Sequence, residues 1–245
     1  MTTAHPLSPL PTRERPTGSR ILSVIRLQFI NTQTFIWVPL LVLAGAIICS
    51  LLIYLIIPID EPLYGGGAQA PMWVFLTVGI QALTLSLPFS QAMSVTRREF
   101  YIGTVAAAAI SAAGLATVYL IIAGIEQLTN GYGGIGYIAH LPWFFADGWA
   151  QAWLAFFMFT LFAFVAGFWF ATVFKRWGPL MLTAVIIGLS LLLILAVFIV
   201  TRLELWPDVV TWFATTGPGL FAVYGLIVTA ALGVGSYLTL RRTVV

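Results

Sequence analysis

The chain has 245 residues, of which 60% are hydrophobic and only 8% are charged, and its formal net charge is +3. A soluble domain carries roughly a quarter charged residues, so this composition excludes an ordinary water-soluble domain. A bilayer admits helices or closed barrels, and the apolar runs lack the alternation of barrel strands. The sequence therefore predicts an all-α membrane protein.

Uncharged runs of about the 20 residues needed to cross a bilayer predict six spans. They cover residues 35–58, 72–93, 103–125, 149–174, 180–200 and 220–240. If the N-terminus is cytoplasmic, the inner side carries Arg13, Arg15, Arg20, Arg26, Arg97, Arg98, Lys175, Arg176, Arg241 and Arg242, and the outer side only Arg202. This bias predicts that both termini are cytoplasmic. It also explains the positive net charge without a nucleic-acid partner.

The N-terminal region divides into two parts. Residues 1–18 contain four prolines among Ser, Thr and Arg, which predicts a disordered cytoplasmic tail. Residues 19–33 alternate arginines with aliphatic residues at helical spacing. Two interpretations remain open for this segment: an amphipathic helix on the inner leaflet, or a cytosolic extension of the first span.

Two further segments are informative: the loop before the last span, and one face of the second span. Pro207 and Asp208 before a short apolar run predict a short outer helix over about 207–215. In the second span one helix face carries Thr77, Gln81, Thr84, Pro88 and Gln91. This face is interpreted either as the wall of a substrate path, with a kink at Pro88, or as a set of interhelical hydrogen bonds. Both interpretations place it inward or at a subunit interface.

The third and fourth spans differ in side-chain size. Gly103 and the alanines that follow predict close helix packing in the third span. The fourth span is rich in Phe and Trp on all sides, which favours a lipid-facing surface over a hydrophobic-substrate site.

Catalytic and nucleotide-binding motifs are missing from the sequence. It contains no G-x-x-x-x-G-K-[ST], no H-E-x-x-H and no G-x-S-x-G, and its two histidines, His5 and His140, lie outside the predicted spans. No Asp, Glu, Lys or Arg falls in the middle of a span, which argues against a proton-coupled carrier. We therefore expect neither a catalytic nor a metal site, and no cofactor bound by this chain.

A short charged segment joins the second and third spans. Thr96-Arg97-Arg98-Glu99 matches a capping box, in which Thr96 covers backbone N–H groups and Glu99 reaches back to the cap. Phe100 follows. The segment predicts a helix that begins at the cytoplasmic surface.

The stretch that ends at Thr104, LSLPFSQAMSVTRREFYIGT, resembles a segment of type-2 ABC transporter permeases, in which a proline precedes a small-Ser/Thr-Arg-aromatic pattern and a Gly-Thr pair. The six spans, the helix before the first span and the last outer loop are similar to that family too. The motif covers about 20 residues, and the architecture covers most of the chain.

The resemblance implies a permease subunit of a bacterial exporter in the inner membrane. Segment 94–103 would be a coupling helix that docks on a separate ATP-binding subunit, with contacts from Thr96, Arg97, Arg98, Glu99 and Phe100. It further implies two identical or homologous permease subunits, surrounding membrane lipid, and two ATPase subunits that hold ATP and Mg²⁺.

A second hypothesis is a membrane scaffold or immunity-type protein that transports nothing and binds a partner or lipid. A scaffold would tolerate substitution of Arg97 or Phe100, whereas a permease would not. The aromatic interior favours a hydrophobic substrate over a sugar or an ion.

Overall fold

The computed structural model describes residues 17–30, 32–57, 61–87 and 95–241. Within these ranges, five helices are long and apolar enough to cross a membrane: Gln33–Ile56, Gly67–Ser86, Arg97–Leu128, Trp149–Arg202 and Pro218–Arg241. Two-residue strands β1 (Leu63–Tyr64) and β2 (Gly136–Tyr137) form a small parallel pair. These long apolar helices confirm the predicted all-α fold class.

The elements follow the predicted spans closely. Helix α1 (Thr17–Ile30) lies before the first span, which consists of η1 (Gln33–Trp37) and α2 (Val38–Ile56). The second span consists of η2 (Gly66–Gln69), α3 (Ala70–Gln81) and η3 (Ala82–Ser86). The remaining helices are α5 (Arg97–Leu128), α6 (Asn130–Gly134), α7 (Trp149–Arg202), α8 (Trp206–Thr215) and α9 (Pro218–Arg241). The expected short helix at 207–215 is α8. The predicted tail lies almost wholly outside the described residues.

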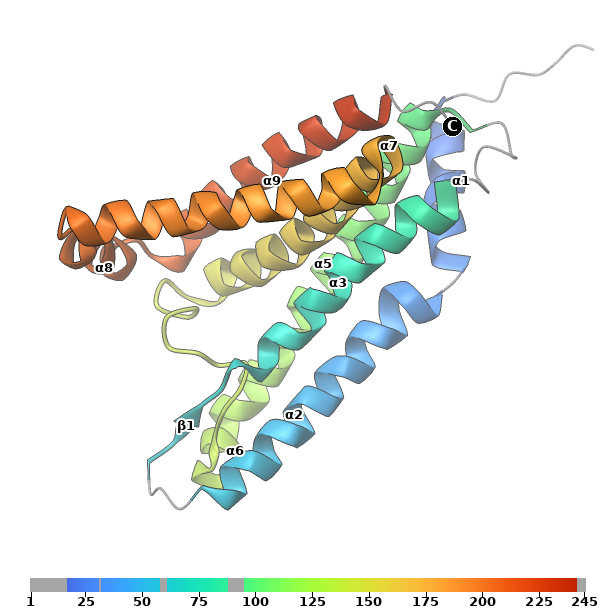
Figure 1. Ribbon diagram of the computed structural model, residues 1–245. Helices are drawn as coiled ribbons and strands as arrows, with labels where there is room; N and C mark the ends of the chain where they lie inside the picture. Colours follow the sequence, from blue (N-terminus) through green and yellow to red (C-terminus); the bar gives the residue numbers. More distant parts are fainter. Residues whose placement is uncertain (1–16, 31, 58–60, 88–94, 242–245) are drawn as a thin grey trace, which may run out of the picture.

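Helix α7 is two arms joined by a break. Gly178 has φ 82° and ψ −179°, and Pro179 follows it, so the α-helical hydrogen bonds cannot continue through this point. The chain reverses there, and the second arm runs back past the bundle (Figure 1). The break lies between the predicted spans at 149–174 and 180–200.

The first arm of α7 is the central helix, with α3, α5 and α9 packed around it. Its contact with α3 depends on two glycines. A Cβ on Gly167 would collide with the carbonyl oxygen of Leu76, and one on Gly79 would collide with that of Phe164. The two backbones therefore touch directly, which is the close approach that small residues permit in lipid.

The fourth span faces lipid only in part, contrary to the expectation. Phe156, Phe164 and Phe168 in the first arm are at most 1% exposed and belong to the core, whereas Phe162 and Phe174 are exposed. Within α7 the second arm is the more exposed part, because its side chains from Leu180 to Ile199 are mostly exposed. An aromatic-rich helix became the centre because large rings fill the space between three neighbouring helices.

The bundle has two chemically different ends. Helix α1, the start of α5, the α7 break and the end of α9 lie at one end, while β1, α6 and α8 lie at the other (Figure 1). The first end carries Arg26, Arg97, Arg98, Lys175, Arg176 and Arg241. The second carries Glu61, Glu126, Asp147, Glu204, Asp208 and Arg202. We refer to them below as the basic end and the acidic end.

Candidate functional site

The predicted capping box forms at the basic end. Thr96 is extended (φ −71°, ψ 151°), and its side chain accepts a hydrogen bond from the Glu99 backbone N–H at 3.3 Å. In return, Glu99 Oε2 accepts from the Thr96 backbone N–H at 3.0 Å. Helix α5 therefore begins at Arg97, as the sequence indicated.

The five predicted coupling residues differ in exposure. Thr96 and Arg98 are exposed, and Arg97 is half-buried, with its guanidinium donating to the carbonyl of Leu240 at 3.3 Å. Glu99 is 6% exposed, and Phe100 is fully buried in the core. Phe100 thus has no surface to offer a partner in this arrangement, because its ring faces the inside of the bundle.

Helix α1 packs against the start of α5. Val24 is 1% exposed, and a Cβ on Gly103 would lie 2.6 Å from the Val24 Cβ. Gln28 donates through Nε2 to Thr104 Oγ1 at 2.9 Å, and its Oε1 accepts from Ser86 Oγ at 3.4 Å. Helix α1 runs in a different direction from α2 and packs against the start of α5 (Figure 1). It is therefore a separate helix and does not extend the first span.

The polar face of the second span does not point into the protomer. Thr77 and Gln81 are exposed, and Thr84 is half-buried. Thr77 donates to the carbonyl of Val74 at 2.7 Å, and Thr84 to that of Ile80 at 2.9 Å, so both hydroxyls bond within their own helix. The exposed position of Thr77 and Gln81 does not fit an inward location, and the location at a subunit interface stays a prediction. Pro88 and Gln91 lie outside the described residues.

The π-helical segment η3 directly precedes the predicted kink. It covers Ala82–Ser86, two residues before Pro88 in the sequence. A π-bulge widens the backbone ladder and is a recurrent cause of helix bending. The described part of this span thus departs from α-helical geometry just before Pro88, and the kink at Pro88 itself stays a prediction.

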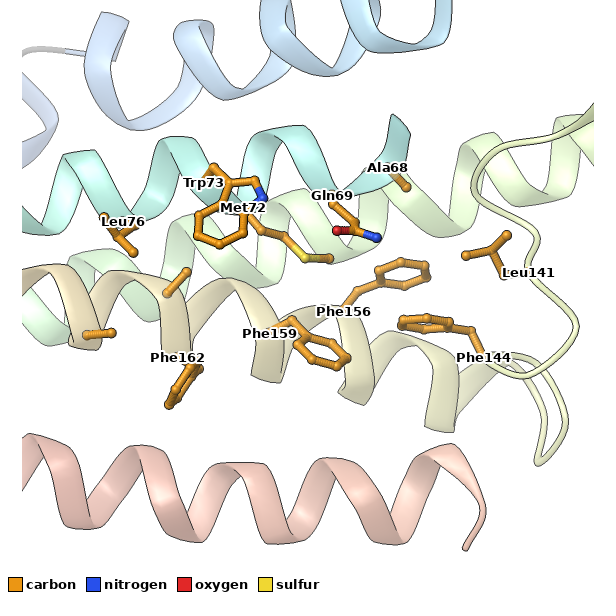
Figure 2. Close-up of a pocket in the computed structure, with 12 residues that line it drawn as sticks. Ala68, Gln69, Met72, Trp73, Leu76, Leu141, Phe144, Phe156, Phe159 and Phe162 are labelled. Carbon is orange, nitrogen blue, oxygen red and sulfur yellow. The ribbon is translucent and has the colours of Figure 1, made fainter. Parts of the chain in front are cut away.

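An apolar cavity of about 440 Å³ lies between α3 and the first arm of α7. Its wall includes Met72, Trp73, Phe144, Phe156, Phe159 and Phe162. Figure 2 shows these rings and the Met72 thioether turned toward a shared space, with Gln69 at the edge. The size and lining are typical of a site for a hydrophobic small molecule.

The cavity wall is held in place by stacked rings. Phe156 stacks on Tyr119 at 4.5 Å and on Phe144 at 4.7 Å between ring centroids. The Tyr119 hydroxyl donates to the carbonyl of Ala68. Because Ala68 itself lines the cavity, this hydrogen bond ties the start of the second span to α5, and the stacking of Tyr119 on Phe156 links α5 to the central helix.

The most completely buried charged side chain in the described part of the chain is one that the sequence did not single out. Glu126, near the end of α5, is fully buried, and its carboxylate accepts backbone hydrogen bonds from three consecutive residues. Oε1 accepts from Ile138 at 3.1 Å and Ala139 at 3.2 Å, and Oε2 accepts from Ala139 at 3.0 Å and His140 at 2.7 Å. The carboxylate thus fixes the start of the loop that leads to the Figure 2 cavity. The sequence feature that could have indicated this site is a glutamate near the end of an apolar helix, followed closely by a glycine-rich segment.

Tyr132 completes the enclosure of Glu126. Burial, the nearby Glu126 charge and a hydrogen bond to Glu126 raise the pKa of Tyr132 to about 12. The residues of α6 all have positive φ, from 48° at Asn130 to 91° at Gly134. This left-handed turn, which glycine permits, brings Tyr132 back over the end of α5.

The Tyr132 hydrogen bond predicts a pH effect above pH 10. Because the pKa is about 10 in the unfolded chain and about 12 in the folded one, this contribution to stability is complete below pH 10 and is lost as the pH rises toward 12. We expect Tyr132→Phe to flatten the fall of the unfolding midpoint between pH 10 and 12. The measurement is thermal unfolding by tryptophan fluorescence, with Tyr64→Phe, an exposed tyrosine, as control. If the unfolding midpoint fell equally steeply with pH in the wild type, Tyr132→Phe and Tyr64→Phe, the raised pKa would not belong to Tyr132.

In the described part of the chain, no three His, Cys, Asp or Glu side chains gather closely enough to hold a metal ion. The site thus consists of two parts: the capped basic end and the apolar cavity near the acidic end. Comparison of the chain with protein-family models, with curated proteins and with solved structures finds no match in any of the three.

Proposed function

We propose that this chain is the membrane-spanning permease subunit of an ATP-driven exporter, and that the two arms of α7 are separate spans, giving six. The observation that carries the proposal is the construction of the basic end. There, a capped helix start lies against α1 through Gln28 and Thr104 and against the end of α9 through Arg97 and Leu240. Three segments far apart in the sequence therefore form one rigid unit.

Such a unit suits the transmission of force from a cytoplasmic subunit. A movement of the α5 start would be passed to α1 and α9 together, because hydrogen bonds and the Val24–Gly103 contact join them. The exposed residues Thr96 and Arg98 are the contacts we assign to the ATP-binding subunit. Glu99 and Phe100 act in our proposal as supports of that surface. The positive-inside bias assigns the basic end to the cytoplasm.

The substrate we propose is apolar. The Figure 2 cavity is bounded by aromatic rings and Met72, with Gln69 as its polar contribution at the edge. A hydrophobic molecule dissolved in the bilayer could enter it without losing water from charged groups. The exposed polar face at Thr77 and Gln81 is where we place a second permease subunit.

The test is co-purification of the tagged chain from its native membrane, followed by an ATPase assay. We expect a stoichiometric ATP-hydrolysing subunit with the wild type, and at least a tenfold weaker association with Arg98→Glu, because the exposed charge is reversed at the contact. Arg202→Glu, at the acidic end, is the matched control and should behave as wild type. A wild-type chain that purifies without an ATPase would refute the permease and favour a membrane scaffold.

A further inference from the structure

A second apolar site begins at the basic end, and it is lined by other residues of the first arm of α7 than the Figure 2 cavity. It is an open groove of about 520 Å³ between α5 and α9, with the first arm of α7 as its floor. Tyr101 and Tyr237 line it, with ring centroids 5.3 Å apart, and Leu161 and Val165 contribute from α7. The Tyr101 hydroxyl donates to the Gly233 carbonyl at 2.7 Å, so it is satisfied inside the protein.

One end of the groove is cationic. Arg98, in the first turn of α5, lines the groove, is exposed and has no ion-pair or hydrogen-bond partner among the described residues. The hydrogen bond from Arg97 to Leu240 holds the first turn of α5 beside the last turn of α9, where Arg241 is also exposed. The one acidic side chain of this corner in the described chain, Glu99, is buried against the Thr96 backbone.

The groove has the length of a lipid tail. On α9 its lining extends from Leu226 to Tyr237, a distance of eleven helical steps, which at 1.5 Å per step is about 16–17 Å along the helix. Half of a hydrocarbon core is about 15 Å thick. A molecule in the groove would thus have a charged group at the membrane surface and an apolar chain reaching toward the bilayer centre.

We propose that this groove binds one anionic phospholipid, with the phosphate at Arg98 and an acyl chain between α5 and α9. The guanidinium offers several N–H donors to phosphate oxygens, a pairing that basic pockets between membrane helices use for acidic headgroups. A helix of another protein is less suited to the groove, because burying it there would leave the Arg98 charge without a counter-ion. The inference does not depend on an ATPase partner, because lipid binding is measured on the chain alone; in the proposed exporter the lipid phosphate and the ATP-binding subunit would share Arg98.

The experiment measures bound lipid on the purified, delipidated chain by native mass spectrometry. The probes are phosphatidylglycerol, phosphatidylcholine with the same acyl chains, and glycerol phosphate as the free headgroup. We expect one tightly retained phosphatidylglycerol on the wild type, weaker phosphatidylcholine, and no retained glycerol phosphate. Arg98→Gln should weaken phosphatidylglycerol binding about fivefold, since one interfacial arginine contributes on the order of that factor. Arg202→Gln should bind as wild type.

A second variant tests the groove without touching Arg98. Ala230 lines the groove and is exposed, so Ala230→Trp can fill it without a clash in the core. We expect loss of the retained lipid, whereas Val223→Trp, exposed on the same helix outside the groove, should keep it. Equal retention of both lipids, or an unchanged preference in Arg98→Gln and Ala230→Trp, would overturn the proposal. If only glycerol phosphate were retained, the groove would be a site for free phosphate compounds. If the chain formed a dimer that covered the groove, its occupant would be a second copy of the chain.

Discussion

Replacing Gly167 with alanine is expected to destabilise the protein by about 3 kcal/mol or more, at the upper end of overpacking effects. The added Cβ would collide with the carbonyl oxygen of Leu76, which belongs to the backbone of α3 and cannot rotate away. The helices must separate, and the contacts around Phe164 and Phe168 loosen with them. In thermal unfolding followed by tryptophan fluorescence, the midpoint should fall by roughly 10 °C.

Gly188→Ala is the matched control. Gly188 belongs to the second arm of the same helix, and no atom lies within 4 Å of the position its Cβ would take. Its substitution should leave the midpoint unchanged or raise it slightly, because alanine favours helix over glycine by about 1 kcal/mol. If Gly167→Ala unfolded at the wild-type temperature, the direct backbone contact between α3 and α7 would be wrong.

A double substitution sharpens this test. Gly79 approaches Phe164 in the same interface, so Gly79→Ala alone should cost a similar amount. Once either alanine has separated the helices, the second meets less resistance. The combined loss should therefore be clearly smaller than the sum, as is usual for residues that share a contact. Strict additivity would mean that the two glycines act at independent sites.

Removing the Glu126 carboxylate should have the second large effect. Glu126→Ala would leave two buried and one partly buried backbone N–H group without an acceptor, and Glu126→Gln would turn an amide N–H₂ toward donors. Buried hydrogen bonds to a charged group contribute about 1.5–3 kcal/mol, so we expect a loss on the order of 3 kcal/mol for either variant. The midpoint should fall by roughly 10 °C.

The loop itself provides the more specific readout. Amide hydrogen exchange at Ile138, Ala139 and His140 should accelerate in Glu126→Gln, while the core of α5 remains protected. Glu61→Gln is the control, because Glu61 is an exposed carboxylate at the same end. Unchanged exchange at the three amides would show that the carboxylate does not hold this loop.

Much of the fold could be predicted, since it depends on local properties of the sequence. Apolar runs of bilayer length, the Thr96–Glu99 capping box, the Pro207–Asp208 helix start and the gap between the predicted spans at 149–174 and 180–200 each depend on a local stretch of sequence. Close packing of the third span was also predictable, and Ala108, Ala112 and Ala116 are fully buried. Apart from this packing, the deciding interaction in each case lies within one helix or at its end.

The sequence by itself determined the class of protein, the order of its helices and the charge difference between its two ends. Which helix occupies the centre was decided by the tertiary structure, and the same holds for the burial of Phe100, the enclosure of Glu126 and the groove beside Arg98. In a chain this apolar, the helix surfaces that face lipid and those that face another helix have the same amino-acid composition. The difference between them arises only when the helices pack, because shape complementarity, and not hydrophobicity, selects the contacts inside a membrane.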